Sequence, residues 1–338
     1  MNTQSVSPHG EPLDRTERSL ILDMDVGVDD AIAIMYLAGH PEVHIAALGS
    51  VHGNAEAPLA ADNARRVLEL CGLGDVPVAV GAWRPLAQRL ETAGSVHGDD
   101  GLGNTDQPPP RRGPTGEHAV DQLIRLAHER PGRYDLLATG PLTNLGAALV
   151  MDRDLPRLIR SVTVMGGSAD GVGNASANGE ANIWHDPEAA ELVFQAGWPI
   201  TMVGLDVTMA TRLEEPELSA IAASQSPQAR FATAILAHYL GIHELGLARR
   251  ICPLHDPLAA GIAVDPSLIV RAVDTGVQVS RDGQTRGMTV IDRRPKYADQ
   301  AGRQGPLTRV ALEVDSARFV ADLVRVLTTP LPPRADPA

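Results

Sequence analysis

The sequence predicts an α/β fold, in which helices flank an open, mostly parallel sheet. Short β-rich runs alternate with helical patterns along the first 205 of the 338 residues, and such alternation is typical of strand–helix–strand units. Polar residues collect where the predicted strands end, which is where open sheets of this class bind ligands. Hydrophobic residues make up 43% and charged residues 21% of the chain. This composition is that of an ordinary globular protein and excludes a disordered chain.

The expected elements follow one another in a regular order. Strands are predicted at 19–22, 43–49, 76–80, 134–138, 161–164 and 199–205, with helices between them at 30–38, 57–70, 118–129, 142–151 and 187–195. Asp29 or Asp30 can cap the first helix and Asp186 the helix at 187–195, because acidic side chains suit helix N-termini. Later helices are predicted at 228–243, 256–264 and 317–327, and a hairpin at 273–280 and 288–291.

No internal repeat or long linker interrupts this pattern. A single domain is therefore predicted over 19–328, with flexible tails at 1–18 and 329–338. The N-terminal tail lacks the apolar segment of a secretory signal, and no apolar run reaches the ~18 residues of a membrane span. Cys71 and Cys252 lie far apart and form no metal-ligand spacing. The sequence thus predicts a reduced, cytoplasmic protein without a membrane segment.

The charge balance narrows the range of partners. The chain has 42 acidic and 29 basic residues, a net charge of −13, and a single lysine, Lys296. A negative field of this kind disfavours nucleic acid and anionic membrane surfaces. It suits a cation or a neutral small molecule.

Four aspartates fall within eight residues at the end of the first predicted strand. They are Asp23, Asp25, Asp29 and Asp30, around Gly27. Helix capping accounts for Asp29 or Asp30 alone, but carboxylates crowded into one turn repel one another. A hard divalent cation relieves that repulsion, and both Ca²⁺ and Mg²⁺ take carboxylate oxygens as ligands. The turn therefore predicts a metal site.

A second acidic segment lies far along the chain, in Leu254-His255-Asp256-Pro257. Taken alone, Asp256 is best explained as a helix N-cap with Pro257 at the first helical position. It can also complete the metal shell, and His255 would then be poised beside it as an acid.

Other polar groups follow the remaining strands. Met165 precedes two glycines that allow a sharp turn, and Asn174, Glu180 and Asn182 come after it. A polar surface loop is the alternative explanation for this segment. Weaker signals, each insufficient alone, are Asn54 in VHGN, His97 in VHGD and Thr139 in TGPLTN.

Together these segments resemble the inosine–uridine nucleoside hydrolase family. The motifs DMDVGVDDAIAI, VHGN, ATGPLTN, VMGG, NIWHDPEAA, TMVGLDVT and LHDP match in order, over about residues 19 to 328. The resemblance implies an α/β fold, a tightly bound Ca²⁺ and hydrolysis of the N-glycosidic bond of ribonucleosides. It also implies a homodimer or homotetramer.

The resemblance assigns roles to individual residues. It implies that Asp25, Asp30 and Asp256 bind Ca²⁺ through carboxylates and Thr139 through its backbone carbonyl, and that Asp25 also takes the proton of the attacking water. The residues implied around the ribose are Asp29, Asn54, Met165, Asn174, Glu180 and Asn182. Asp23 would lie behind the metal ligands.

The leaving base needs an acid, and His255 and His97 are both candidates. The base pocket is expected near His97, His243 and the helix that contains Tyr239. Many family members carry a tyrosine where this sequence has His243, so both the proton donor and the preference between purines and pyrimidines stay open.

Two other classes of protein share some of these features. A phosphatase of the haloacid dehalogenase type also begins with Asp-x-Asp after a strand, but it needs a basic residue on the phosphoryl group. Lys296 lies outside every strand-end motif. A non-catalytic sugar- or nucleoside-binding module would need neither an acid nor a metal with an open water position. The hydrolase is favoured over the binding module, and the phosphatase ranks last.

Overall fold

The computed structural model describes residues 18–247, 249–293 and 305–331. The tails predicted at 1–18 and 329–338 fall almost entirely outside these ranges, as does Lys296. Among the described helices, none is both long and apolar enough to cross a membrane.

A ten-stranded sheet forms the centre of the described chain, in the order β11-β10-β12-β7-β6-β5-β1-β2-β3-β4. The strands are β1 (Arg18–Met24), β2 (Val43–Ser50), β3 (Val78–Val80), β4 (Thr115–His118), β5 (Tyr134–Ala138), β6 (Ser161–Met165), β7 (Ile200–Val203), β10 (Ile269–Val279), β11 (Thr289–Ile291) and β12 (Leu307–Val314). Strands β1 to β7 and β12 pair in parallel, whereas β10 is antiparallel to both β12 and β11. The predicted open, mostly parallel sheet is confirmed.

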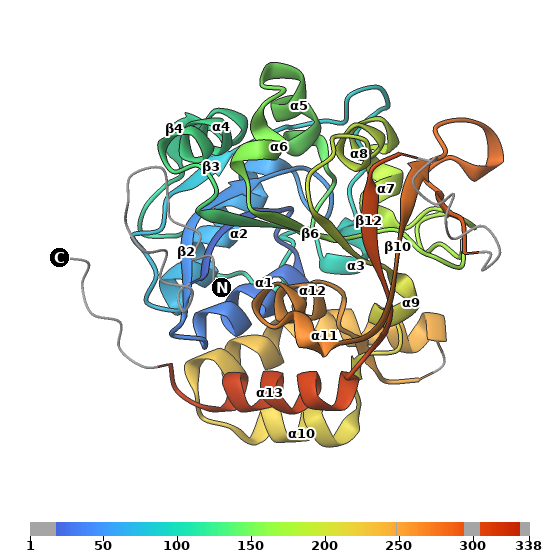
Figure 1. Ribbon diagram of the computed structural model, residues 1–338. Coiled ribbons are helices and arrows are strands. Elements are labelled where there is room, and N and C mark those ends of the chain that lie inside the picture. Colours follow the sequence, from blue (N-terminus) through green and yellow to red (C-terminus); the bar gives the residue numbers. More distant parts are fainter. Residues whose placement is uncertain (1–17, 248, 294–304, 332–338) are drawn as a thin grey trace, which may run out of the picture.

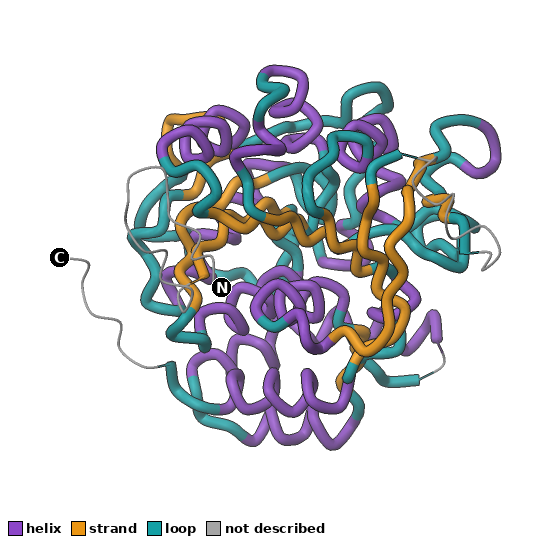
Figure 2. Tube along the Cα trace, viewed as in Figure 1, coloured by secondary structure: helices purple, strands orange, loops and turns teal. Residues whose placement is uncertain are grey.

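Helices cover both faces of this sheet (Figure 1). The longer ones are α1 (Val28–Ala38), α2 (Ala57–Leu70), α4 (Ala119–Glu129), α5 (Thr143–Met151), α8 (Pro187–Phe194), α10 (Glu215–Ala223), α11 (Pro227–Leu247), α12 (His255–Val264) and α13 (Ser316–Thr328). The layer of α4, α5 and α8 lies on one side of the strands, and α1, α10, α11, α12 and α13 lie on the other (Figure 2).

Alternation along β1 joins the two layers. Leu20, Leu22 and Met24 are buried in the core under α1 and α12, whereas Ile21 belongs to the core under α4 and α5. Because side chains of a strand point to opposite faces in turn, a strand buried on both sides must be apolar throughout. The strand predicted at 19–22 could therefore be recognised from its consecutive apolar residues.

The order of strands creates a switch point beside β1. The chain runs from β1 outward through β2, β3 and β4, and then returns to the other side of β1 at β5. A crevice opens at the carboxyl ends of the strands where the direction of winding reverses. The acidic turn after β1 and Thr139 after β5 both lie at this point.

Some elements were not predicted. β12 was not expected, and it lies between β10 and β7. The hairpin expected at 273–280 and 288–291 is present as β10 and β11, which form the edge of the large sheet. β4 and α10 were also missed. A two-stranded sheet of β8 (Arg212–Leu213) and β9 (Cys252–Pro253) is too short to show a periodic pattern.

Candidate active site

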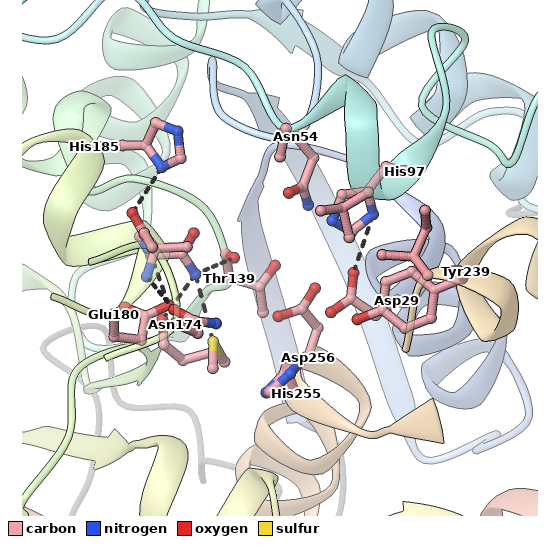
Figure 3. Close-up of a pocket in the computed structure, with 17 residues that line it drawn as sticks. Asp29, Asn54, His97, Thr139, Asn174, Glu180, His185, Tyr239, His255 and Asp256 are labelled. Atoms are coloured by element: carbon pink, nitrogen blue, oxygen red, sulfur yellow. Dashed lines mark hydrogen bonds and ion pairs between the residues drawn. The ribbon is translucent and has the colours of Figure 1, made fainter. Parts of the chain in front are cut away.

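A cavity of about 260 Å³ opens at the switch point. Of the residues predicted for the site, its lining includes Asp29, Asn54, His97, Thr139, Met165, Asn174, Glu180, Asn182, His255 and Asp256. Asn174, Glu180 and His185 lie on one side of the cavity and His97 and Tyr239 on the other, with Thr139, Asp29 and Asp256 between them (Figure 3). Segments more than 200 residues apart in the sequence thus meet at one place.

The acidic part of the cavity comes from the first turns of α1 and α12. Carboxylate oxygens of Asp29, Asp30 and Asp256 all lie within 4.8 Å of one another, and all three side chains are buried. The two helices pack side by side, so their N-terminal ends bring these groups together. Asp256 was expected to be the N-cap of its helix, but α12 begins at His255 with Leu254 as N-cap.

Asp25 lies just before α1, and its carboxylate is held from one side by Asn54. The Asn54 backbone N–H donates to Oδ2 of Asp25 at 2.6 Å, and the Asn54 amide donates to Oδ1 at 3.3 Å. Gly53 permits this approach, since a Cβ there would lie 2.0 Å from Oδ2 of Asp25. The loop after β2 therefore fixes the direction of the Asp25 carboxylate.

Asp30 receives three hydrogen bonds. The Gly27 N–H donates at 2.9 Å and the Asn54 amide at 3.1 Å to Oδ2, while the Thr139 hydroxyl donates to Oδ1 at 2.7 Å. The N-cap of α1 is Gly27, not Asp29 or Asp30 as expected, and Asp30 supports this helix end from the third helical position while it also faces the acidic cluster. Its two roles are compatible because each carboxylate oxygen accepts more than one contact.

Burial raises the pKa of these carboxyl groups. The pKa of Asp29 rises to about 7, first through burial and then through the neighbouring Asp30 charge. The pKa values of Asp25 and Asp256 lie well above their usual range for the same two kinds of reason. Burial also raises the pKa of Asp30, although the hydrogen bond from Thr139 opposes it. The cluster is electrostatically costly unless positive charge compensates it.

The donor set fits a hard divalent cation. Every donor in the cluster is an oxygen, which suits Ca²⁺ or Mg²⁺ and not a site for zinc, where nitrogen and sulfur ligands dominate. Oδ1 of Asp29 is buried and accepts no hydrogen bond from the described residues. A buried oxygen of this kind is costly to leave without a partner, and Nδ1 of His97, 3.8 Å away, is too distant to donate a hydrogen bond to it.

The opposite wall of the cavity carries neutral amides and one carboxylate. The Asn182 amide donates to the backbone carbonyls of Thr139 at 2.7 Å and Met165 at 3.2 Å. Glu180 caps the short helix α7 (Ala181–His185), accepting from the N–H groups of Asn182 and Ile183. Asn174 accepts from the Ala181 N–H at 2.9 Å through its side-chain oxygen. These contacts hold polar side chains in place around a space that suits a polyhydroxylated ligand.

Two histidines reach the cavity from different elements. Nδ1 of His97, at the end of α3 (Gly94–His97), accepts from the Val28 N–H at 3.2 Å and lies 3.8 Å from Oδ1 of Asp29. The ring of Tyr239 on α11 is 5.4 Å from that of His97, centroid to centroid. Nδ1 of His255 lies 2.8 Å from the Thr208 hydroxyl. Both histidines stay candidates for the leaving-group acid.

The structure also adds residues that the sequence did not single out. His185, in NIWHDPEAA, lines the cavity and bonds to the Ala181 carbonyl through Nδ1 at 2.7 Å. Thr208, in TMVGLDVT, contacts His255. Both lie inside matched motifs, and that is the signal that could have found them. The His243 side chain lies outside what the structure describes.

Behind the cavity, Asp23 supports the strand ends. Its Oδ2 accepts from the Asn144 amide at 2.8 Å, and that amide also donates to the Ser50 carbonyl at 2.9 Å. Burial raises the pKa of Asp23 to about 7, although the Asn144 hydrogen bond opposes the rise. Asp23 does not line the cavity, and its place behind the metal ligands stays a prediction.

Comparison with known proteins agrees with this geometry. The sequence profile of the family described as "Inosine-uridine preferring nucleoside hydrolase" matches residues 20–321. The inosine-uridine preferring nucleoside hydrolase of Crithidia fasciculata is 34% identical over 306 residues, covering 89% of this chain and 95% of that protein. The pyrimidine-specific ribonucleoside hydrolase RihA of Photobacterium profundum is 37% identical over 278 residues, covering 82% of this chain and 89% of its own length.

Solved structures show the same similarity. A plant nucleoside hydrolase superposes with a TM-score of 0.86 at 34% identity, covering 93% of this chain and 99% of its own. A purine-preferring ribonucleoside hydrolase from Gardnerella vaginalis superposes with a TM-score of 0.86 at 32% identity, covering 92% of this chain and 98% of its own. The similarity therefore extends over almost the whole fold, including the strand ends that build the cavity.

Proposed function

The chain belongs to the inosine-uridine preferring nucleoside hydrolase family and is an enzyme of that kind, and we propose that it uses Ca²⁺ to hydrolyse ribonucleosides to ribose and free base. The observation that carries the calcium dependence is the buried cluster of Asp29, Asp30 and Asp256, whose oxygens lie within 4.8 Å of one another. Across the cavity, this cluster faces the side chains of Asn174, Glu180 and Asn182, which hydrogen bonds hold in place.

The residues that would hold the cation are Asp25, Asp30 and Asp256, together with the Thr139 carbonyl. A bound Ca²⁺ makes a coordinated water more acidic. Asp25 would take the proton of that water, and its orientation by Asn54 supports this role. Asp29 stays a ribose ligand in the proposal, although its carboxylate lies close enough to contribute to the metal site as well.

Cleavage of the glycosidic bond develops positive charge on the sugar, and carboxylates in a buried cavity stabilise such charge. The departing base takes up negative charge as the bond breaks, so an acid that protonates it accelerates the reaction. His255 or His97 would supply this proton. Both line the cavity, His97 from the end of α3 and His255 from the first residue of α12.

The ribose is recognised in the proposal by Asp29, Asn54, Met165, Asn174, Glu180 and Asn182. Removing a hydroxyl from a site built to bind it leaves buried polar partners unpaired, which can cost 10⁴-fold or more in discrimination. A 5′-phosphate would meet the Glu180 carboxylate, and no lysine or arginine lines the described part of the cavity to compensate. Ribonucleosides are therefore favoured over both deoxynucleosides and nucleotides.

The experiment is a substrate panel scored for free ribose. Uridine, cytidine, inosine, adenosine and guanosine would establish the base preference. 2′-Deoxyuridine and uridine monophosphate should be at least about a hundredfold poorer than uridine in kcat/KM, a difference of about 2.7 kcal/mol. If either were cleaved as well as uridine, the assigned ribose site would be wrong.

Family membership and the cavity lining argue against the two alternative functions, a phosphatase and a non-catalytic binding module. A phosphatase needs a cationic side chain on the phosphoryl group, and the described lining supplies none. A binding module without turnover disagrees with membership of a hydrolase family. A homodimer or homotetramer and a cytoplasmic location stay predictions from the sequence, and we propose that the enzyme acts in purine and pyrimidine salvage.

A further inference from the structure

We propose that Thr208 is a positioning residue for this hydrolysis: its hydroxyl holds Nδ1 of His255, so that Nε2 is presented to the leaving base. The inference rests on the proposed function, with His255 as the proton donor, and goes one step beyond it, because it names the side chain that orients this histidine. It also gives a role to a residue that does not line the cavity.

The contact between the two side chains is short and buried. The Thr208 hydroxyl oxygen lies 2.8 Å from Nδ1 of His255, and the two residues are 0% and 7% exposed. An imidazole has two nitrogens, and a hydrogen bond at one of them orients the ring and therefore fixes the direction of the other. With Nδ1 engaged by Thr208, the nitrogen that can serve the substrate is Nε2.

The backbone fixes the two residues relative to each other. Thr208 ends the short helix α9 (Leu205–Thr208), which follows β7. Four residues later the chain enters β8, which pairs with β9, and β9 ends two residues before α12 begins. In addition, the Leu254 N–H donates to the Thr211 carbonyl at 2.9 Å. The β8–β9 pairing and this hydrogen bond join the two segments next to the Thr208–His255 contact. They therefore hold the Thr208 hydroxyl at a fixed distance from the His255 imidazole.

The two histidines are anchored by different means, and this makes the proposal testable. Nδ1 of His97 accepts from the backbone N–H of Val28, and no side-chain substitution at Val28 removes that N–H except proline. His255 is anchored by a side-chain hydroxyl that one substitution removes. A change at Thr208 therefore perturbs His255 and leaves the backbone anchor of His97 in place.

The variant is Thr208→Val, which replaces the hydroxyl by a methyl group of nearly the same size. Thr208→Ser restores the hydroxyl. Thr211→Val is the matched control, since Thr211 is also 0% exposed and its hydroxyl bonds to the Val207 carbonyl and to Ser316, not to His255. Each variant would be assayed with uridine and with a nitrophenyl riboside, whose activated leaving group needs no acid. Calcium content would be measured in parallel.

Thr208→Val should lower kcat for uridine at least about tenfold and change KM for uridine less than about threefold. The rate with the nitrophenyl riboside should also change less than about threefold, because acid catalysis matters only for a basic leaving group. Thr208→Ser should recover the uridine rate, and calcium content should not change in either variant. In a His255→Ala background, Thr208→Val should add no further loss on uridine, because residues that act as a unit are not additive.

Equal losses on both substrates, or a Thr208→Val effect that persists without His255, would overturn the positioning role. A uridine rate unchanged by Thr208→Val would overturn it as well. These outcomes differ from failure of the proposed function, which would appear as absence of ribose release by the unmodified enzyme.

Discussion

Replacing Asp25 with asparagine should abolish turnover while the chain stays folded. The substitution keeps the size of the side chain and removes its charge, so it removes both the proposed metal ligand and the proposed base. Asp25 is buried at 1% exposure beside the carboxylates of the acidic cluster, and loss of one charge from that cluster relieves repulsion. The loss of this charge is therefore not expected to lower the free energy of unfolding.

The size of the effect follows from the contacts of Asp25. Both of its oxygens accept hydrogen bonds from Asn54, at 2.6 and 3.3 Å. An asparagine has only one oxygen, so its NH₂ group would face one of these donors, at a cost of about 1–3 kcal/mol for the lost bond. General base catalysis contributes about 10²–10⁴ to a rate. The lost hydrogen bond lowers the stability of the variant, whereas the loss of base catalysis alone predicts a fall in kcat of at least about a hundredfold, or 2.7 kcal/mol.

The assay is release of ribose from uridine, with calcium content and thermal unfolding measured on the same preparation. Asp23→Asn is the matched control: it makes the same change at a buried carboxylate two residues earlier, which bonds to Asn144 and not to Asn54. It should keep activity within about tenfold of the unmodified enzyme. If Asp25→Asn retains its metal and loses less than about tenfold, ~1.4 kcal/mol, then Asp25 is not the base.

Three further predictions concern the metal, the acid and the effect of pH. Protein purified without chelator should contain about one calcium per chain, which Asp256→Asn should lose and Asp29→Asn should retain; zinc, or no metal at all, would contradict the assignment. His255→Ala should slow uridine cleavage far more than cleavage of a nitrophenyl riboside, whereas the same pattern in His97→Ala would point to the other histidine. Since the pKa of Asp23 is raised to about 7 in the folded protein from an ordinary 3.8, the folded state favours its protonated form. Its contribution to stability is therefore present below about pH 4 and is lost as pH rises to about 7, by about 4 kcal/mol. Urea unfolding of chelated protein should show the stability of wild type falling relative to Asp23→Asn over this range, and a constant gap would disprove the assignment.

Local patterns in the sequence determined much of the fold. The strand–helix alternation indicated the parallel sheet because the central strands β1, β5 and β6 are almost wholly buried, and at least one helix separates each of them from the next strand in the chain. Asp186 was recognisable as an N-cap, and its side chain does accept from the Ala189 N–H at 3.1 Å. Such features depend on residues close together in the chain, so periodicity and capping chemistry are enough to predict them.

The acidic turn was predictable for the same local reason, and so was the place of the site at the strand ends. The residues alone left Asp256 either as a helix N-cap or as a metal ligand, and only the resemblance to a family favoured the second role, because more than 200 residues separate Asp256 from Asp30. Its position depends on the packing of α12 against α1. No periodic pattern shows which helices share an interface.

Tertiary structure alone decided how the side chains are directed. It turns Asp25 toward Asn54 and groups Asp29 with Asp30 and Asp256, although the four aspartates of the turn are chemically identical. It also inserts β12 between β7 and β10 and brings Thr208 to His255 through the pairing of β8 with β9. These arrangements depend on contacts between segments distant in sequence, whose free energies arise only when the whole chain is packed.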